Sequence, residues 1–239
     1  MEIQTQTAPT FDIDCAELTT RAINRAIRDA AAAGSTSIRL LHPGARHNLG
    51  VALPEGFRLS IEGSAGYYVG GLNDGSTIEV HGSAGWGAAE SMRDGTVVID
   101  GDAGNAVAAS IRAGTVVVRG NASTRAGIAM KGGLLLVAGD VGPMAAFMMQ
   151  KGVLIICGDA GDGLADSMYA GTVFLAGQHG ELGGDAVEEQ PSDEDLRFIE
   201  EALARWNIPR PAGAFRKFVA GKKLWNFQQS EIGLWRSAL

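Results

Sequence analysis

The chain has 239 residues, of which 34 are glycine, and its composition is 46% hydrophobic, 6% aromatic and 20% charged. This content of apolar side chains excludes a disordered polypeptide, and the formal net charge of −7 argues against general nucleic-acid binding. Cys15 and Cys157 are far apart and belong to no CxxC or Cys/His ligand pattern. We therefore expect no disulfide framework, no zinc site and a reducing, cytoplasmic location.

Residues 1–48 are predicted to cap the rest of the fold. Met1–Asp14 is acidic and has no apolar core, so we expect no secretory signal there. Cys15–Ala33 has the apolar spacing of an amphipathic helix, which Gly34 ends. A short strand, Ser37–Leu41, is expected next, and the helix and strand together should cover the first coil of the repeat region.

Residues 49–187 contain a glycine repeat with a period of 19 residues. The repeat glycines are Gly63, Gly82, Gly101, Gly120, Gly139, Gly158 and Gly177. Each follows a short β-rich run bounded upstream by another glycine, as in Thr115–Val118 and Thr172–Leu175. Such runs are too short for helices and indicate strands. The pattern lacks the signatures of leucine-rich, calcium-binding nonapeptide and Rossmann repeats, so it predicts an all-β core: a right-handed parallel β-helix of about seven coils.

Alternation within each strand predicts which side chains face the interior. The positions four and two before each repeat glycine are apolar in all seven copies, as in Leu135 and Val137, and we assign them to the core. A further column ten positions after the glycine is also predicted to be core: Met92, Ile111, Met130, Met149 and Met168. Gap filling is a commoner role for such methionines than cofactor contact.

One outward-facing column changes character along the repeat. It begins with polar Ser60 and Glu79 and continues with five apolar side chains, namely Val98, Val117, Leu136, Ile155 and Phe174. An uncovered apolar stripe of this length is unfavourable in water, so either this chain or a partner must cover it. We expect a partner interface formed by Val117, Leu136, Ile155 and Phe174.

Residues 188–239 are predicted to form a helix followed by an extended arm. Ser192 and Asp195 have the spacing of a capping box at the start of the helix. From Ile208 onward the chain has six basic residues and one acid, together with several aromatic side chains. Such a composition suits an interface, so the arm should clasp a partner through Arg216, Lys217, Lys222, Lys223 and Trp225. The alternative is that the arm folds back onto its own acidic solenoid.

The sequence offers no convincing catalytic, cofactor or metal site. The four histidines show no metal-ligand spacing, and Ser64 and Ser83 belong to no nucleophile motif. The side chains that follow the repeat glycines, as at Asp102 and Asp140, are typical of turns that hydrogen-bond to the backbone.

Two features of the sequence support a resemblance to a known family. The Gly-x-Ala-Gly coils at Gly63–Gly66, Gly82–Gly85 and Gly101–Gly104, preceded by Thr20–Ile27, resemble the GXGXG β-helix domain of glutamate synthase large subunits. The segment Phe215–Phe227 resembles the small GXGXG subunit of N-methylglutamate synthase, also called methylamine-glutamate N-methyltransferase.

The resemblance implies a structural subunit of an enzyme complex without catalytic residues of its own. The expected partners are a class II glutamine-amidotransferase-like subunit and a glutamate-synthase-like subunit that binds FMN and an iron-sulfur cluster. The complex would convert methylamine and L-glutamate to N-methylglutamate and ammonia. Two alternatives stay open: the subunit with the same coils in a formylmethanofuran dehydrogenase or formyltransferase/hydrolase complex, and a free-standing solenoid that binds a ligand.

Overall fold

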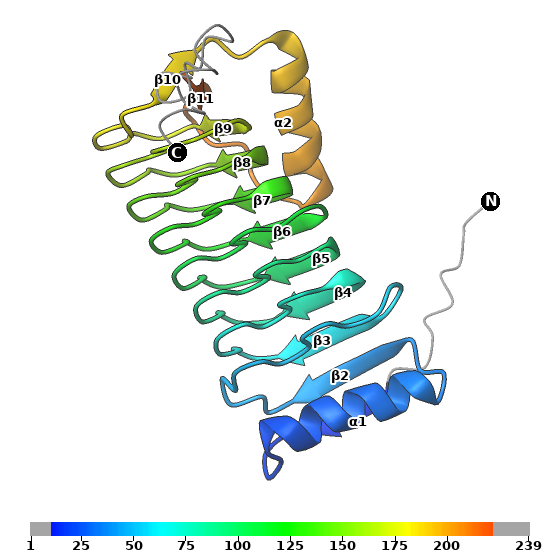
Figure 1. Ribbon diagram of the computed structural model, residues 1–239. Coiled ribbons are helices and arrows are strands. Elements are labelled where there is room, and N and C mark those ends of the chain that lie inside the picture. Colours follow the sequence, from blue (N-terminus) through cyan, green and yellow to red (C-terminus); the bar gives the residue numbers. More distant parts are fainter. Residues whose placement is uncertain (1–10, 222–239) are drawn as a thin grey trace, which may run out of the picture.

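The computed structural model describes residues 11–221, which form a β-solenoid with two helices (Figure 1). The chain begins with β1 (Phe11–Asp14), α1 (Thr20–Ala32) and β2 (Ser37–Leu41). The coils then contribute β3 (Arg58–Glu62), β4 (Asp74–Val80), β5 (Asp94–Ile99), β6 (Thr115–Val118), β7 (Lys131–Val137), β8 (Lys151–Ile156) and β9 (Thr172–Leu175). The C-terminal part consists of β10 (Ala186–Glu189), α2 (Asp193–Arg205) and β11 (Arg216–Ala220).

The strands form one sheet in the order β1 to β9, followed by β11 and then β10. The strands β1 to β9 are parallel, and from β3 onward residues pair with the residue 19 positions further on, as Leu135 does with Leu154, except at the starts of β4 and β7, where Asp74 and Lys131 pair 20 positions further on. A second parallel ladder connects the turns from Ala65 to His179. The prediction of a parallel β-helix with a 19-residue coil is therefore confirmed.

The interior of the solenoid is the main hydrophobic core. The inward-facing pair on each strand is buried, as Leu135 and Val137 show with 0% exposure. Met92, Ile111, Met130, Met149 and Met168 are buried as well, which confirms their assignment to the core. Stacking identical positions at strand spacing thus gives continuous columns of apolar side chains.

Two glycine columns meet two different physical requirements. Gly152, in the upstream column, has φ +106°, a conformation that side chains with a Cβ rarely adopt. Gly139, in the repeat column, does not have a positive φ, but a Cβ there would lie 2.8 Å from the carbonyl oxygen of Gly120 in the preceding coil. From Gly82 to Gly177, close approach of successive coils rather than a strained corner is therefore the reason for the repeat glycine, whereas Gly63, in the first copy, has φ +137°.

Helix α1 covers the end of the solenoid at β2 (Figure 1). Its buried side chains are Ile23 and Ile27, and its N-cap Thr19 accepts a hydrogen bond from the backbone of Ala22 at 3.3 Å. The helix therefore begins at Thr20, later than the predicted Cys15, because Cys15 instead donates its backbone N–H to Leu41. Neither helix within residues 11–221 is long and apolar enough to cross a membrane.

Helix α2 lies along the outer face of the upper coils, and β10 and β11 close that end (Figure 1). Its predicted capping box is present: the Ser192 hydroxyl accepts from the Asp195 backbone at 3.1 Å, and the Asp195 carboxylate accepts from the Ser192 backbone at 2.8 Å. The strand β11 pairs antiparallel with both β9 and β10. The sequence pattern did not predict β1, β10 or β11.

Candidate interaction surfaces

The apolar column expected to meet a partner is covered by the chain itself. Val117, Leu136 and Ile155 are 0% exposed and Phe174 is 2% exposed. They form a second core with Ile199, Ala202, Leu203, Ile208 and Phe215, which come from α2 and the segment that follows it. This corrects the expectation of a partner interface at these four residues, because the amphipathic α2 supplies the apolar cover that the column requires.

The first part of the basic arm also belongs to the fold of this chain. Arg216 donates to the carbonyl oxygen of Gly177, and Phe218 is fully buried in the main core. The Lys217 ammonium lies 2.9 Å from Asp195 Oδ2, and both side chains are about one-fifth exposed, at 19% and 20%. The described part of the arm therefore folds back, whereas the predicted contacts of Lys222, Lys223 and Trp225 lie outside the described residues.

Asp195 links the arm electrostatically to α2. Burial works to raise the pKa of its carboxyl, but the Ser192 backbone N–H and the Lys217 ammonium together hold that pKa below its ordinary value. The ion pair thus stabilises the docked position of both elements.

The acidic side chains after the repeat glycines act on the backbone, as predicted, but across coils. Asp102 Oδ1 accepts from the backbone N–H of Asn121 at 2.7 Å, and Asn121 Oδ1 does the same for Asp140 at 2.8 Å. The ladder continues through Asp140 to Asp159 at 2.7 Å. These side chains therefore bind one coil to the next.

One arrangement of catalytic residue types has no signature in the sequence. His81 lies between Ser60 on β3 and Asp100, with Nε2 3.1 Å from Ser60 Oγ and Nδ1 2.8 Å from Asp100 Oδ2. His81 and Asp100 directly follow β4 and β5. The Ser60 hydroxyl, however, donates to Glu62 at 2.9 Å rather than to the histidine, and Asp100 also receives Arg119 at 3.1 Å. The group lies on an open face of the sheet. The backbone N–H groups of these strands are used in the strand ladder, so they are not offered to a developing oxyanion. The arrangement is therefore that of a surface ion-pair network rather than of a catalytic triad.

The cysteines and metal-ligand residue types support no reactive centre in the described part of the chain. Burial raises the pKa of the Cys157 thiol to about 11, and that of Cys15 is also raised by burial. Within residues 11–221, no group of three or more His, Cys, Asp or Glu side chains is placed to hold a metal ion.

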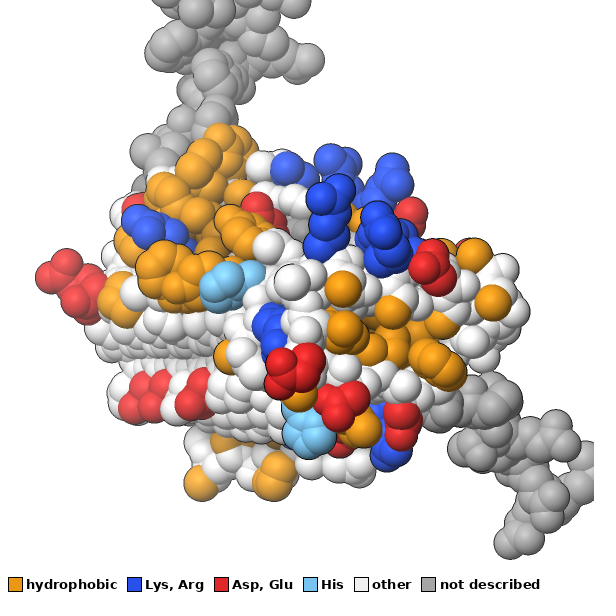
Figure 2. Space-filling model, turned by 90° about the horizontal axis from the view of Figure 1, so that it is seen from below, with side chains coloured by type: hydrophobic (Ala, Val, Ile, Leu, Met, Phe, Trp, Pro, Cys, Tyr) orange, Lys and Arg blue, Asp and Glu red, His pale blue; other side chains and the backbone are white. Residues whose placement is uncertain are grey.

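An exposed stack of aromatic rings lies on the first coils. The His47 and Tyr67 rings stack with centroids 4.4 Å apart, and Tyr67 and Trp86 stack at 5.1 Å. Tyr67, Tyr68 and Trp86 remain 39%, 45% and 54% exposed. Figure 2 shows a hydrophobic area beside a group of Lys and Arg side chains on the face of the molecule that is seen from below. The spacing of the repeat could have predicted this stack, because Tyr67 and Trp86 each follow a repeat glycine by four positions and so occupy equivalent places in successive coils.

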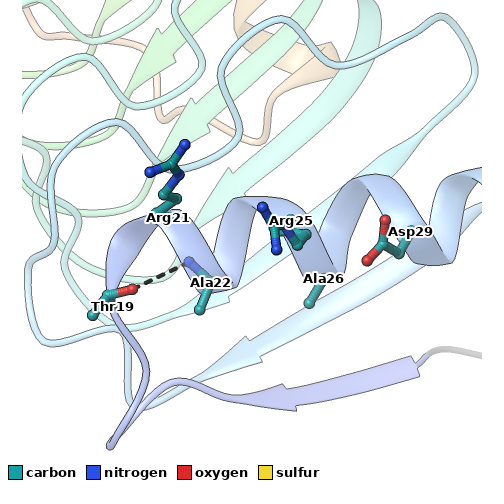
Figure 3. A pocket seen from close by; sticks show the side chains of 6 residues that line it. All are labelled: Thr19, Arg21, Ala22, Arg25, Ala26 and Asp29. Carbon is teal, nitrogen blue, oxygen red and sulfur yellow. Dashed lines mark hydrogen bonds between the residues drawn. The ribbon is translucent and has the colours of Figure 1, made fainter.

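The outer face of α1 carries three exposed arginines. Arg21, Arg25 and Arg28 recur at helical spacing and form no ion pair or hydrogen bond within the described chain. A depression of about 530 Å³ lies beside Arg21 and Arg25, and its lining is completed by Thr19, Ala22, Ala26 and Asp29. Figure 3 shows these six side chains along α1.

Comparison with known proteins identifies the family. Residues 16–201 match the GXGXG motif family, a span that includes α1, all coils from β2 to β9, and most of α2. The chain belongs to the GXGXG family. A search of curated proteins finds no match to it.

Among solved structures, this GXGXG protein is similar to a chain of the formyltransferase/hydrolase complex from Methylorubrum extorquens, which was solved with methylofuran. The two are 24% identical with a TM-score of 0.68, and the match covers 84% of this chain and 89% of the other. At this identity the likeness concerns the fold. This similar chain is part of a multisubunit complex.

Proposed function

We propose that this chain is a structural subunit that braces other subunits of a multisubunit enzyme complex. The observation that carries the proposal is the match of nearly the whole chain to nearly a whole chain of such a complex, at 84% and 89% coverage. The fold suits the role, because coils joined by an unbroken parallel ladder and by side-chain ladders form a stiff rod. Catalysis would then belong to the partner subunits.

Two complexes are candidates for the assembly. A formyltransferase/hydrolase complex or a related formylmethanofuran dehydrogenase is supported by the structural neighbour, whose likeness covers 84% of this chain. N-methylglutamate synthase is supported by the resemblance of Phe215–Phe227 to that enzyme's GXGXG subunit, and the coils resemble the GXGXG domain of the related glutamate synthases. The structural comparison favours the first candidate, and the second rests on sequence resemblance.

Affinity purification of the tagged chain from its native host tests both the bracing function and the choice between the two candidate complexes. Mass spectrometry should identify stoichiometric partner subunits, which an identically tagged unrelated protein does not retain. Formyltransferase and hydrolase chains would establish the first candidate, whereas glutamate-synthase-like chains with flavin absorption would establish the second. A chain that purifies alone at native expression level would refute the bracing function.

A further inference from the structure

We propose that the arginines of α1 and the neighbouring aromatic stack form one docking surface for an acidic segment of a partner subunit. We call this set the Arg–aromatic surface: Arg21, Arg25, Arg28, His47, Tyr67, Tyr68 and Trp86. The inference rests on the proposed function as a subunit, and it adds which face binds and what chemistry the partner presents there.

The two parts of the surface are neighbours in the fold. Asn24 lies between Arg21 and Arg28 on α1, and its Nδ2 donates to the Asn48 carbonyl at 2.8 Å. Its Oδ1 also accepts from the Gly50 backbone at 3.3 Å. Because His47 directly precedes Asn48, this contact places the arginine face of α1 beside the start of the aromatic stack.

The aromatic part is held rigidly before any partner arrives. The rings of Tyr67 and Trp86 lie over Gly85 and Gly104 of the next coil, where an added Cβ would be 2.6 Å and 2.7 Å from a ring carbon. The backbone N–H of Tyr67 also donates to His47 Nδ1 at 2.9 Å. Fixed, exposed aromatic rings lose little conformational entropy on binding, and tyrosine and tryptophan are enriched among residues that dominate interfaces.

The hydrogen bond to His47 also defines what this ring offers a partner. Because Nδ1 accepts a hydrogen bond from the backbone N–H of Tyr67, the neutral ring carries its own proton on Nε2. The N-terminal end of the stack therefore presents a hydrogen-bond donor, which suits a carboxylate or a carbonyl oxygen.

The arginine part indicates the charge of the partner. Arg21 and Arg25 are four positions apart, and like charges at this spacing destabilise a helix slightly. Elsewhere on the first coils arginines are paired, as Arg39 is with Asp12 at 2.6 Å and Arg93 with Asp74 at 3.2 Å. Exposed, unpaired guanidinium groups beside aromatic rings match the composition of protein interfaces, and carboxylates are the groups that complement them best.

The shape of the arginine part is also compatible with an inserted side chain. The depression between the arginines has Ala22 and Ala26 in its lining, and these small residues leave the space open (Figure 3). Asp29 is the acidic group of the lining and lies at the far end from Thr19 (Figure 3). The acidic segment should therefore contact Arg21 and Arg25 and avoid Asp29.

Binding of purified variants to the partner subunits recovered from the native complex tests the inference. The double reversal Arg21→Glu/Arg25→Glu should weaken binding at least about tenfold and reduce its dependence on salt. Trp86→Ala should weaken binding about 30-fold while leaving the salt dependence in place. Arg197→Glu, an exposed and unpaired arginine on α2, is the matched control and should bind as the wild type does.

Each variant should melt within about 2 °C of the wild type, because all the replaced side chains are exposed. A variant that melts at a lower temperature is replaced by Arg28→Glu or Tyr67→Ala. Wild-type affinity in both surface variants would overturn the inference while the bracing function stands. It would equally be overturned if the arginines bound a single-stranded oligonucleotide instead of the subunits, or if they mediated dimerisation of the isolated chain in light scattering. Failure to recover any partner subunit refutes the bracing function itself, and the inference with it.

Discussion

The C-terminal strand should be an integral part of the solenoid, and Phe218 provides the sharpest test. This ring is 0% exposed, packs in the main core and meets the His179 ring edge-on at a centroid distance of 5.4 Å. Its strand, β11, closes the sheet between β9 and β10. Replacing Phe218 by alanine removes a buried aromatic side chain and leaves a cavity.

Substitutions of this type cost about 3–5 kcal/mol. For a protein of this size each kcal/mol corresponds to about 2–4 °C, so the melting temperature of Phe218→Ala should fall by roughly 6–20 °C. The loss should be local, because each coil of a solenoid contacts mainly its neighbours. Hydrogen exchange should therefore become about 100-fold faster or more in β9 and α2, while β3 and β4 keep their protection.

Circular-dichroism melts and peptide-resolved hydrogen exchange on the isolated chain would measure both effects. Phe198→Ala is the matched control, because Phe198 lies on α2 but is 40% exposed, and it should change the melting temperature by no more than about 2 °C. Ending the chain after Asn207 should destabilise it at least as much as Phe218→Ala, because the truncation removes this ring with the whole strand. If Phe218→Ala behaves like its control, the segment is not part of the core and its docking on β9 is wrong.

Four further outcomes are expected from particular contacts. Leu136→Asp should destabilise the isolated chain by about 4 kcal/mol or more in urea unfolding, because it buries a charge beneath α2; normal stability would contradict that cover. Gly139→Val should cost about 1–3 kcal/mol through collision with the preceding coil, whereas Gly184→Val, with no atom within 4 Å of its Cβ position, should be tolerated in the same assay. Asp195→Asn should lower the melting temperature at pH 7. Because the folded pKa of Asp195 lies below its ordinary 3.8, this deficit should shrink as the pH falls through that folded value, and a deficit constant from pH 7 to 3 would refute the linkage. Alkylation of Cys157 by iodoacetamide at pH 8 should be about 100-fold slower in the folded chain than in urea, since burial raises its pKa from 9.0 to about 11, and equal rates would contradict this.

The repeat made most of the solenoid predictable. Two predicted strand segments, Thr115–Val118 and Thr172–Leu175, coincide with β6 and β9. The reason is physical: a 19-residue period repeats the same backbone geometry in every coil, so each column of residues reports one environment seven times. Such redundancy also identified the methionine column as core from its spacing alone.

The return segments could not be predicted in the same way. In one coil Ala106, Ala108 and Ser110 all have positive φ, near 60°, although none is glycine. Propensity assigns this conformation to glycine and asparagine, so the pattern of small residues gave no warning of it. The ladder hydrogen bonds of neighbouring coils hold these residues in place, and that constraint comes from the assembled fold.

The C-terminal strands β10 and β11 were not predicted, for a related reason, although the helix between them was. Phe215–Phe227 has no period, so nothing in its own sequence indicates a strand or its partner. Its composition fits a contact with another subunit and a contact with its own chain equally well. The decision depends on tertiary packing, where Phe218 enters the solenoid and Lys217 reaches Asp195.

The polarity of the outward-facing column nevertheless indicates that α2 covers only part of the sheet. The column begins with Asp12, Arg39, Ser60 and Glu79, and its residues become apolar from Val98 to Phe174. The apolar stretch is the part beneath α2, because a sheet face that loses contact with water must exchange polar for apolar side chains. The polar stretch, in turn, belongs to the coils that α2 leaves open.

This division of the sheet face has a consequence for assembly. The apolar cover required by the last coils is supplied within the chain, so those coils need no partner to be stable. The first coils instead leave a polar sheet face, a rigid aromatic stack and unpaired arginines accessible together. A brace must hold its own shape at one end and offer binding groups at the other. In the brace that we propose, the change from Glu79 to Val98 marks the boundary between those two tasks.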